Sequence, residues 1–290
     1  MKHILTLLAL TTTLALAAPA KPAPVILGPA LTALGAKFEA NWQFKEPALI
    51  LKTDASLSEE AWKEITTLTP QRVSAGGKGI DDAALIRFSK LPLEQFSTDG
   101  STITDEGTAA FAQMKQLIKV SISHNMQLKT VPGLAAHPTL QIVNIGGTSV
   151  GDGALPGLAS IKTLRELSLH HCLGVTDAGV VALAKHPALE KLTLDPQFRP
   201  IITDAAIAPL ATIPNLKDLS INETVLSYAG VSQLKAAKSL TKLTLQKNGI
   251  PTAEVDKLKA ELPKVEIKYE PAEATSIAKW TAAKEKAAKH

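Results

Sequence analysis

Leucine and other aliphatic residues recur along most of the chain in the order L-x-x-L-x-L, in which the intervening residues are mostly polar. Consecutive segments of this kind begin 23 to 27 residues apart, at Leu93, Leu117, Leu140, Leu164, Leu189, Leu216 and Leu240. Leu167 and Leu169, for example, alternate with Ser168. Alternation with a period of two predicts a short strand that buries one face, so each segment is expected to contribute one strand.

A Thr-Asp pair or a variant of it follows most of these strands and precedes a run of Ala, Leu and Val. Thr176-Asp177 and Thr203-Asp204 are clear examples. A short hydroxyl or carboxylate there can accept a hydrogen bond from the first turn of a helix, so we expect these aspartates to cap helices. One leucine of each helix is then expected to pack against the sheet, namely Leu158, Leu183, Leu210, Leu234 and Leu258.

The repeated unit resembles the leucine-rich repeat family over about Ala48 to Ile267. The ending GVTDAG of the repeat from Leu164 is similar to the cysteine-containing subclass found in F-box-associated and many bacterial repeat proteins. The resemblance implies an α/β fold like that of ribonuclease inhibitor. This fold is a curved, right-handed leucine-rich repeat solenoid with a parallel sheet on its concave side and helices on its convex side. Neighbouring repeats must stack, because one repeat cannot enclose its own apolar face.

The sequence is expected to divide into a signal peptide (1–20), an N-terminal capping segment (21–46), a leucine-rich repeat domain (47–269) and a helical or flexible basic tail (270–290). The signal peptide is indicated by an apolar run from Ile4 to Leu16 and by small residues after it, with cleavage between Ala17 and Ala20.

Both flanks of the repeat domain carry apolar residues. Leu31, Leu34, Phe38 and Trp42 have helix-like spacing and are expected to cover the first repeat. VEIKYE from Val265 is expected to supply the last strand.

Charge and cysteine content narrow the class of protein. Lys and Arg number 31 against 27 Asp and Glu, and they are scattered except at the end of the chain, so charge does not favour nucleic acid binding. A single cysteine excludes an internal disulfide, which leaves packing to stabilise an exported protein. We expect a periplasmic or secreted monomer with no integral membrane association and no cofactor.

The stretch HHC contains two histidines and the only cysteine. Counting the first leucine of the repeat as position zero, Cys172 occupies position eight, where five other repeats have Ser, Thr or Asn, so we expect it to be buried and unreactive. His170 at position six is expected on the concave face and His171 in the following turn. Neighbouring residues are not expected to converge on one ion, so the sequence predicts no metal site. A weak surface ion site involving His124 stays open.

A second cluster could carry chemistry. Ser168 and His170 share a strand face, and Asp195 holds the position of His170 in the next repeat, so the three could form a hydrolase triad. Serine or threonine at position four is a feature of nearly every repeat, however, and no glycine-rich oxyanion loop is adjacent. We therefore expect no catalytic residue.

The concave face is the expected binding surface, because its side chains vary while the scaffold fixes them. We expect an exported, non-enzymatic protein that recognises a protein or glycan partner through it. The exported hydrolase and a purely structural envelope component are the alternatives. The candidate binding residues are Lys119, Asn144, Glu166, Ser168, His170, Lys191, Asp195, Asp218, Asn222, Lys242 and Gln246.

Overall fold

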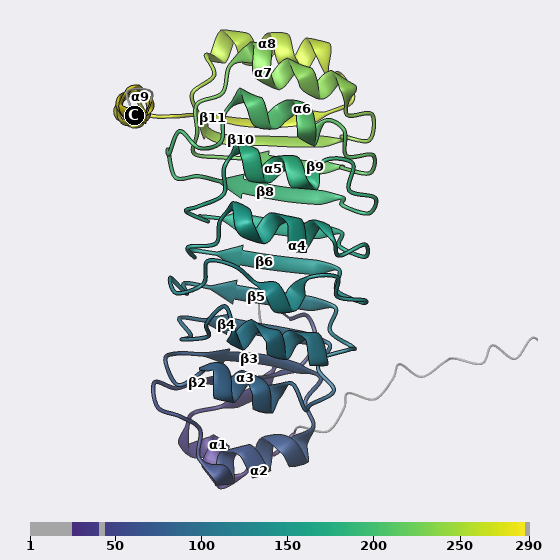
Figure 1. Ribbon diagram of the computed structural model, residues 1–290, viewed down its shortest axis with the longest axis vertical. Helices are drawn as coiled ribbons and strands as arrows, with labels where there is room; N and C mark the ends of the chain where they lie inside the picture. Colours follow the sequence, from purple (N-terminus) through teal and green to yellow (C-terminus); the bar gives the residue numbers. More distant parts are fainter. Residues whose placement is uncertain (1–24, 41–43, 288–290) are drawn as a thin grey trace, which may run out of the picture.

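A computed structural model describes residues 25–40 and 44–287. The expected signal peptide and Trp42 lie outside the described residues. The strands form one sheet in chain order, in which the first pair is antiparallel and every later pair is parallel (Figure 1). The strands are β1 (Lys37–Glu39), β2 (Ala48–Lys52), β3 (Arg72–Gly76), β4 (Gln95–Asp99), β5 (Lys119–Ser123), β6 (Ile142–Gly146), β7 (Glu166–His170), β8 (Lys191–Asp195), β9 (Asp218–Ile221), β10 (Lys242–Asn248) and β11 (Glu266–Pro271).

Helices lie on one side of the sheet in nearly every repeat (Figure 1). The α-helices are α1 (Pro29–Ala33), α2 (Glu59–Leu68), α3 (Asp82–Phe88), α4 (Leu155–Ala159), α5 (Asp177–Val180), α6 (Ile207–Leu210), α7 (Tyr228–Ser232), α8 (Thr252–Glu261) and α9 (Ala274–Ala287). Between them lie the 3₁₀ helices η1 (Gly107–Gln113), η2 (Pro132–Leu134), η3 (Asp152–Ala154), η4 (Val181–Leu183), η5 (Asp204–Ala206) and η6 (Gln233–Ala236). In several repeats, therefore, the segment that connects one strand to the next contains a 3₁₀ helix.

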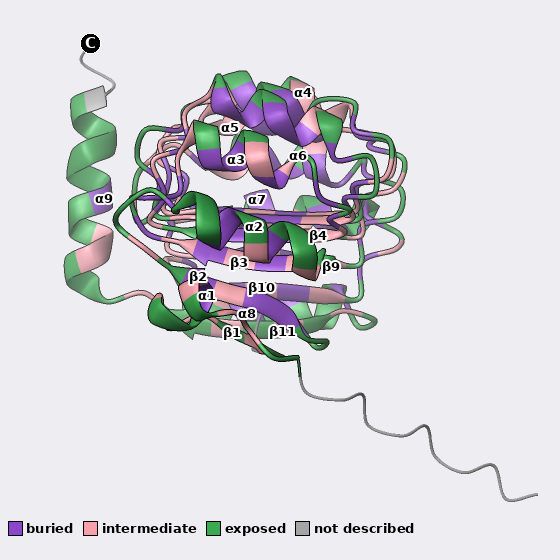
Figure 2. Cartoon of the chain, turned by 90° about the horizontal axis from the view of Figure 1, so that it is seen from below, coloured by how far each residue is buried: buried purple, intermediate pink, exposed green. Residues whose placement is uncertain are grey.

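The core lies between the sheet and this helical layer (Figure 2). All five helix leucines expected to face the sheet are buried, which confirms that prediction. Aliphatic residues fill most of the core, but four aromatic rings form a chain near the N-terminal end. Trp62, Phe88, Phe96 and Phe111 follow one another at centroid separations of 4.8, 5.5 and 5.8 Å. Tilted and edge-to-face contacts of this kind add about 0.5–1.5 kcal/mol per pair to the burial of apolar surface.

Position eight of the repeat forms a buried ladder behind the sheet. Cys172 is 2% exposed, and its Sγ lies 3.2 Å from the carbonyl oxygen of Ile145 and 3.6 Å from Oγ1 of Thr148. This exposure confirms that Cys172 is buried. Burial raises the pKa of its thiol to about 12, which disfavours the thiolate. Asn125 has the corresponding role in the repeat from Leu117, where its Nδ2 donates to the Ile103 carbonyl at 2.7 Å.

The aspartates beyond the strands have a different role from the one expected. Thr176 caps α5, because its Oγ1 accepts from the amide of Ala178. Asp177 instead accepts from the amide and Oγ1 of Thr203 in the next repeat, at 2.8 and 2.6 Å. The expectation that these aspartates cap helices is therefore wrong in most repeats: the hydroxyl caps, and the longer carboxylate reaches the neighbouring repeat. We call this row the aspartate ladder, formed by Asp82, Asp105, Asp152, Asp177 and Asp204.

The N-terminal segment does not form the single helix that its spacing suggests. Helix α1 ends before Gly35, whose φ of +66° is a left-handed conformation that glycine adopts readily. The chain then enters β1, which carries Phe38 and pairs antiparallel with β2. Leu31 is buried, and Leu34 and Phe38 pack at the edge of the core.

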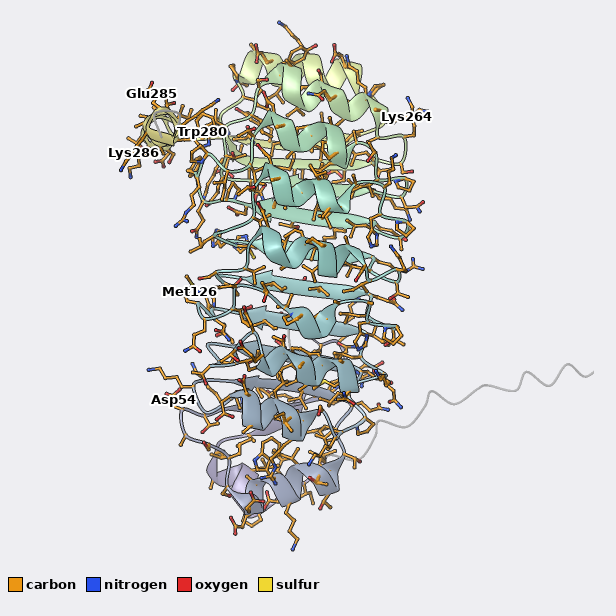
Figure 3. All side chains as sticks on the ribbon, in the orientation of Figure 1. Asp54, Met126, Lys264, Trp280, Glu285 and Lys286 are labelled. Atoms are coloured by element: carbon orange, nitrogen blue, oxygen red, sulfur yellow. The ribbon has the colours of Figure 1, made fainter. Side chains whose placement is uncertain are left out.

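The C-terminal segment contributes β11, as the sequence predicts, and then leaves the stack as α9. This helix stands to the side of the stack, near the ends of the strands (Figures 1 and 2). Trp280 points from α9 toward the body of the molecule (Figure 3) and is 6% exposed. The nitrogen of Lys284 lies 4.9 Å from its ring centroid.

Candidate functional site

The face of the sheet opposite the helices is lined by positions two, four and six of the repeat, and we call it the open face. At position two, acidic and basic residues alternate from strand to strand, in the order Glu166, Lys191, Asp218, Lys242 and Glu266. Nζ of Lys242 is 2.9 Å from Asp218, and Nζ of Lys191 is 3.9 Å from Glu166. Cross-strand pairs of opposite charge stabilise this row, so its net charge is small.

One end of the open face is covered by the N-terminal segment. Phe44 is 2% exposed, and Nζ of Lys119 lies 5.7 Å from the centroid of its ring. Glu46 pairs with Arg72, which also contacts Glu94 at 3.3 Å. Burial lowers the pKa of Lys119, although the charge of Glu166 opposes the shift. Lys119 is therefore a less accessible binding residue than its place on the face suggests.

The remaining candidate residues lie on the open face from β6 to β10. His170, Lys191 and Gln246 are exposed. Asn144, Glu166, Ser168, Asp218, Asn222 and Lys242 are partly buried. Asp195 is the exception, because it is 5% exposed, and the residues after it, Pro196 to Pro200, belong to the longest repeat.

His170, His171 and Asp195 form a compact cluster at the ends of β7 and β8. Nδ1 of His170 is 3.1 Å from Oδ2 of Asp195, and Nε2 of His171 is 3.5 Å from the same oxygen. One nitrogen of each ring and one oxygen of Asp195 all lie within 4.8 Å of one another. The sequence-based expectation that the neighbouring histidines would not converge is therefore wrong.

The turn after β7 explains why neighbouring side chains meet. Successive side chains of a regular strand point to opposite faces. His171 follows the strand in a left-handed conformation, with φ of 56°, and this breaks the alternation. The two imidazole rings consequently stack, with their centroids 3.7 Å apart and their planes at 25°. Position seven is left-handed in other repeats too, at Gly100, His124, Gly147, Glu223 and Lys247.

Glu223 joins the cluster from position seven of a later repeat. Its Oε2 is 3.6 Å from Nε2 of His171, and its Oε1 is 2.8 Å from Nζ of Lys247. Burial raises the pKa of Asp195, and the negative charge of Glu223 raises it further. Burial also opposes ionisation of Glu223, but the hydrogen bond and charge of Lys247 outweigh burial and lower its pKa. The cluster thus holds two carboxylates and one cation beside two imidazoles.

Glu223 is not among the residues predicted from the sequence, because alternation along the strands points to positions two, four and six and gives no role to position seven. Because this position is left-handed in most repeats, its side chains line up along the stack just beyond the ends of the strands. His124, also at position seven, contacts a carboxylate as well, but in the preceding repeat: its Nδ1 lies 2.6 Å from Oδ1 of Asp99.

Solved structures with a similar chain path identify the fold. An internalin, inlF, from Listeria monocytogenes is 18% identical, with a TM-score of 0.52 over 81% of this chain and 71% of that one. TLR13, in a complex with ssRNA13, is 12% identical, with a TM-score of 0.56 over 77% of this chain and 32% of that one. The fold is a leucine-rich repeat solenoid.

A third solved structure is similar over part of this chain. An internalin C2 from the same organism is 20% identical, with a TM-score of 0.48 over 69% of this chain and 80% of that one. No protein-family model matches the chain. No curated protein matches it significantly.

The solenoid supplies only the acid–base half of a hydrolase triad. His170 contacts Asp195, as such a half requires. Ser168 pairs in register with Thr193 on the open face, and among the described residues no hydrogen bond joins its hydroxyl to His170. The stacked ring of His171 occupies one face of the His170 imidazole. Nothing in this geometry distinguishes Ser168 from the serines and threonines of other repeats.

Among the described residues, no helix has the length and apolar character needed to cross a bilayer.

Proposed function

We propose that this protein is exported and works without catalysis, by binding a protein partner on the open face between β6 and β10. The observation that carries the proposal is the contrast along the sheet. Phe44 covers the face near β5, whereas the strands from β7 to β10 present exposed and partly buried polar side chains. A rigid sheet that displays variable polar residues is suited to recognition.

The charges of this face indicate what kind of partner it fits. Position two alternates in sign, so a polyanion such as a nucleic acid would meet Asp218 and Glu166 as well as the lysines. A protein surface with charges of both signs can match such a row, and complementary charges give specificity. The comparison structures support the fold on which this proposal rests, and their own ligands are not assigned to this chain.

A photo-crosslinking amino acid at Ser220 would test the proposal in the cells that make the protein. Ser220 lies at position four of β9, in the middle of the uncovered face. The matched control is the same amino acid at Val181, which is 54% exposed on the helical side. We expect a discrete protein adduct from Ser220 and none from Val181.

Charge removal would then link the adduct to the polar rows. We expect Lys191→Gln together with Lys242→Gln to weaken the adduct strongly while the thermal melting temperature stays within a few degrees. The proposal is wrong if position 220 captures no protein, or if positions 181 and 220 capture the same proteins. Turnover of an ester or peptide substrate that His170→Ala abolishes would instead favour the hydrolase.

A further inference from the structure

The cluster at the ends of β7 and β8 contains a buried polar atom without a hydrogen bond. Nε2 of His171 is enclosed by the protein and has no hydrogen-bond partner. It faces Asp195 Oδ2 at 3.5 Å and Glu223 Oε2 at 3.6 Å, and both distances are longer than a good N–H···O bond. A buried ring nitrogen that faces two carboxylates without bonding either one calls for an explanation.

A metal ion explains both the missing hydrogen bond and the spacing. In a tetrahedral zinc site with bonds of 2.0–2.1 Å, neighbouring donor atoms are about 3.4 Å apart. The separations here are 3.1 Å from His170 Nδ1 to Asp195 Oδ2, and 3.5 and 3.6 Å from His171 Nε2 to the two carboxylates. The two gaps at His171 are too wide for strong hydrogen bonds and are close to the donor spacing around one ion, and one nitrogen of each ring and one Asp195 oxygen lie within 4.8 Å of one another.

The donor set is one that transition metals prefer. Two imidazole nitrogens and a carboxylate select late first-row divalent ions such as Zn²⁺ or Cu²⁺ over the hard ions Ca²⁺ and Mg²⁺, which prefer oxygen alone. The charges agree, because Asp195 and Glu223 bring two negative charges, and the nearby Lys247, which forms its ion pair with Glu223, brings one positive charge. A divalent cation would offset the cost of burying Asp195, which is 5% exposed.

We infer that His170, His171 and Asp195 form a binding site for a divalent transition-metal ion of the Zn²⁺ class, with Glu223 close enough to serve as a fourth ligand. The rings are stacked without the ion, so their lone pairs lie in nearly parallel planes. The side chain of His170 is 51% exposed and has room to turn toward the ion, whereas His171 and Asp195 are held by the turn and the strand. The inference does not depend on the proposed partner.

Isothermal titration of the full chain with ZnCl₂ at neutral pH tests the site, after chelation of bound metal and without a histidine tag. We expect one zinc ion per chain. Asp195→Asn and His171→Asn should each weaken binding about 100-fold or more, because even changes outside the ligand shell cost 10–100-fold. Asparagine tolerates the left-handed conformation of residue 171, so this variant keeps the turn.

His124→Asn is the matched control, because asparagine also tolerates the left-handed conformation of residue 124. His124 is also a position-seven histidine with φ near 50° and an aspartate partner, Asp99, but no second histidine adjoins it. We expect its zinc affinity to equal that of the unchanged protein. A Cu²⁺ form should show electron paramagnetic resonance couplings from two imidazole nitrogens, and His170→Ala should reduce these to one.

Three results would overturn the inference. The first is the absence of zinc binding to the folded chain. The second is an affinity that His171→Asn leaves unchanged while circular dichroism shows a native fold, since the ion would then be held elsewhere. The third is an equal loss of affinity in His124→Asn, which would mean that isolated surface histidines account for the binding.

Discussion

The two ends of the sheet are built from the same repeat but differ in both core and open face. Around β3 to β5 the core contains a chain of aromatic rings in tilted and edge-to-face contact, and Phe44 covers the open face. Around β7 to β10 the core is aliphatic, the face is open, and the histidine cluster lies at the strand ends. The repeated apolar residues thus determine the backbone. The variable positions between them determine which end of the open face is covered and which end is accessible to a ligand.

The strongest test of this comparison is truncation of the core at matched positions. Phe96 and Leu192 both occupy position three of the repeat, and both are fully buried. We expect Phe96→Ala to lower the free energy of unfolding by about 3–5 kcal/mol and Leu192→Ala by about 2–5 kcal/mol. Phe96 should lose more, because it also breaks two ring contacts. Urea unfolding of both variants measures the difference, and a larger loss at Leu192 would contradict the assigned role of the aromatic chain.

Removal of Phe44 should convert the closed end into an open one. Phe44→Ala exposes the ring site beside Lys119, and the lost burial should cost about 1.5–3 kcal/mol of stability. We also expect Lys119 to react faster with an amine-specific acylating reagent, whereas Lys191, already exposed, should react as before. Peptide mass spectrometry of the two lysines measures this, and equal acceleration of both would show general loosening.

The aspartate ladder should contribute equally at both ends. Asp82 and Asp177 each accept two hydrogen bonds from a threonine of the next repeat. We therefore expect Asp82→Asn and Asp177→Asn to destabilise the protein by similar amounts, about 1–3 kcal/mol. Asp99→Asn is the control, because this exposed residue pairs only with His124 in the described chain, and a surface pair is worth about 0–1 kcal/mol. Thermal melts that rank Asp99 with the ladder would refute this role.

The smallest effect on stability is expected from ionisation of Cys172, which lies in the open half, as long as the pH stays well below the pKa of its buried thiol. Its folded pKa of about 12 lies above that of an unfolded thiol, so burial of the neutral thiol stabilises the fold fully below the unfolded pKa. That contribution is lost as the pH rises through the folded value. At pH 8 only about one thiol in ten thousand is ionised in the folded chain. Iodoacetamide should label the protein only after denaturation, and rapid labelling of the native protein would contradict this.

The solenoid was predictable from the sequence because nearly the same pattern of apolar residues recurs in every repeat from Leu93 to Leu240. Leu183 and Leu210 are buried where their spacing places them, and Cys172 is buried like the Ser, Thr and Asn residues that five other repeats have at the same position. The site was less predictable. Alternation along a strand implied that His170 and His171 would diverge, and the left-handed turn that reverses this is not visible in residue types such as His, Glu and Lys. Glu223 reaches the cluster from two repeats away.

The aspartate ladder is interrupted in the middle of the stack, and this interruption affects how the protein unfolds. Asp105 joins its repeat to Thr130, and Asp152 joins its own to Thr176, but within the described chain no carboxylate links the repeat from Leu117 to the one from Leu140. In a stack held by nearest neighbours, the weakest junction sets where cooperativity fails. Partial unfolding should therefore split the protein at this seam, and two blocks with different amide hydrogen-exchange rates should meet between β5 and β6.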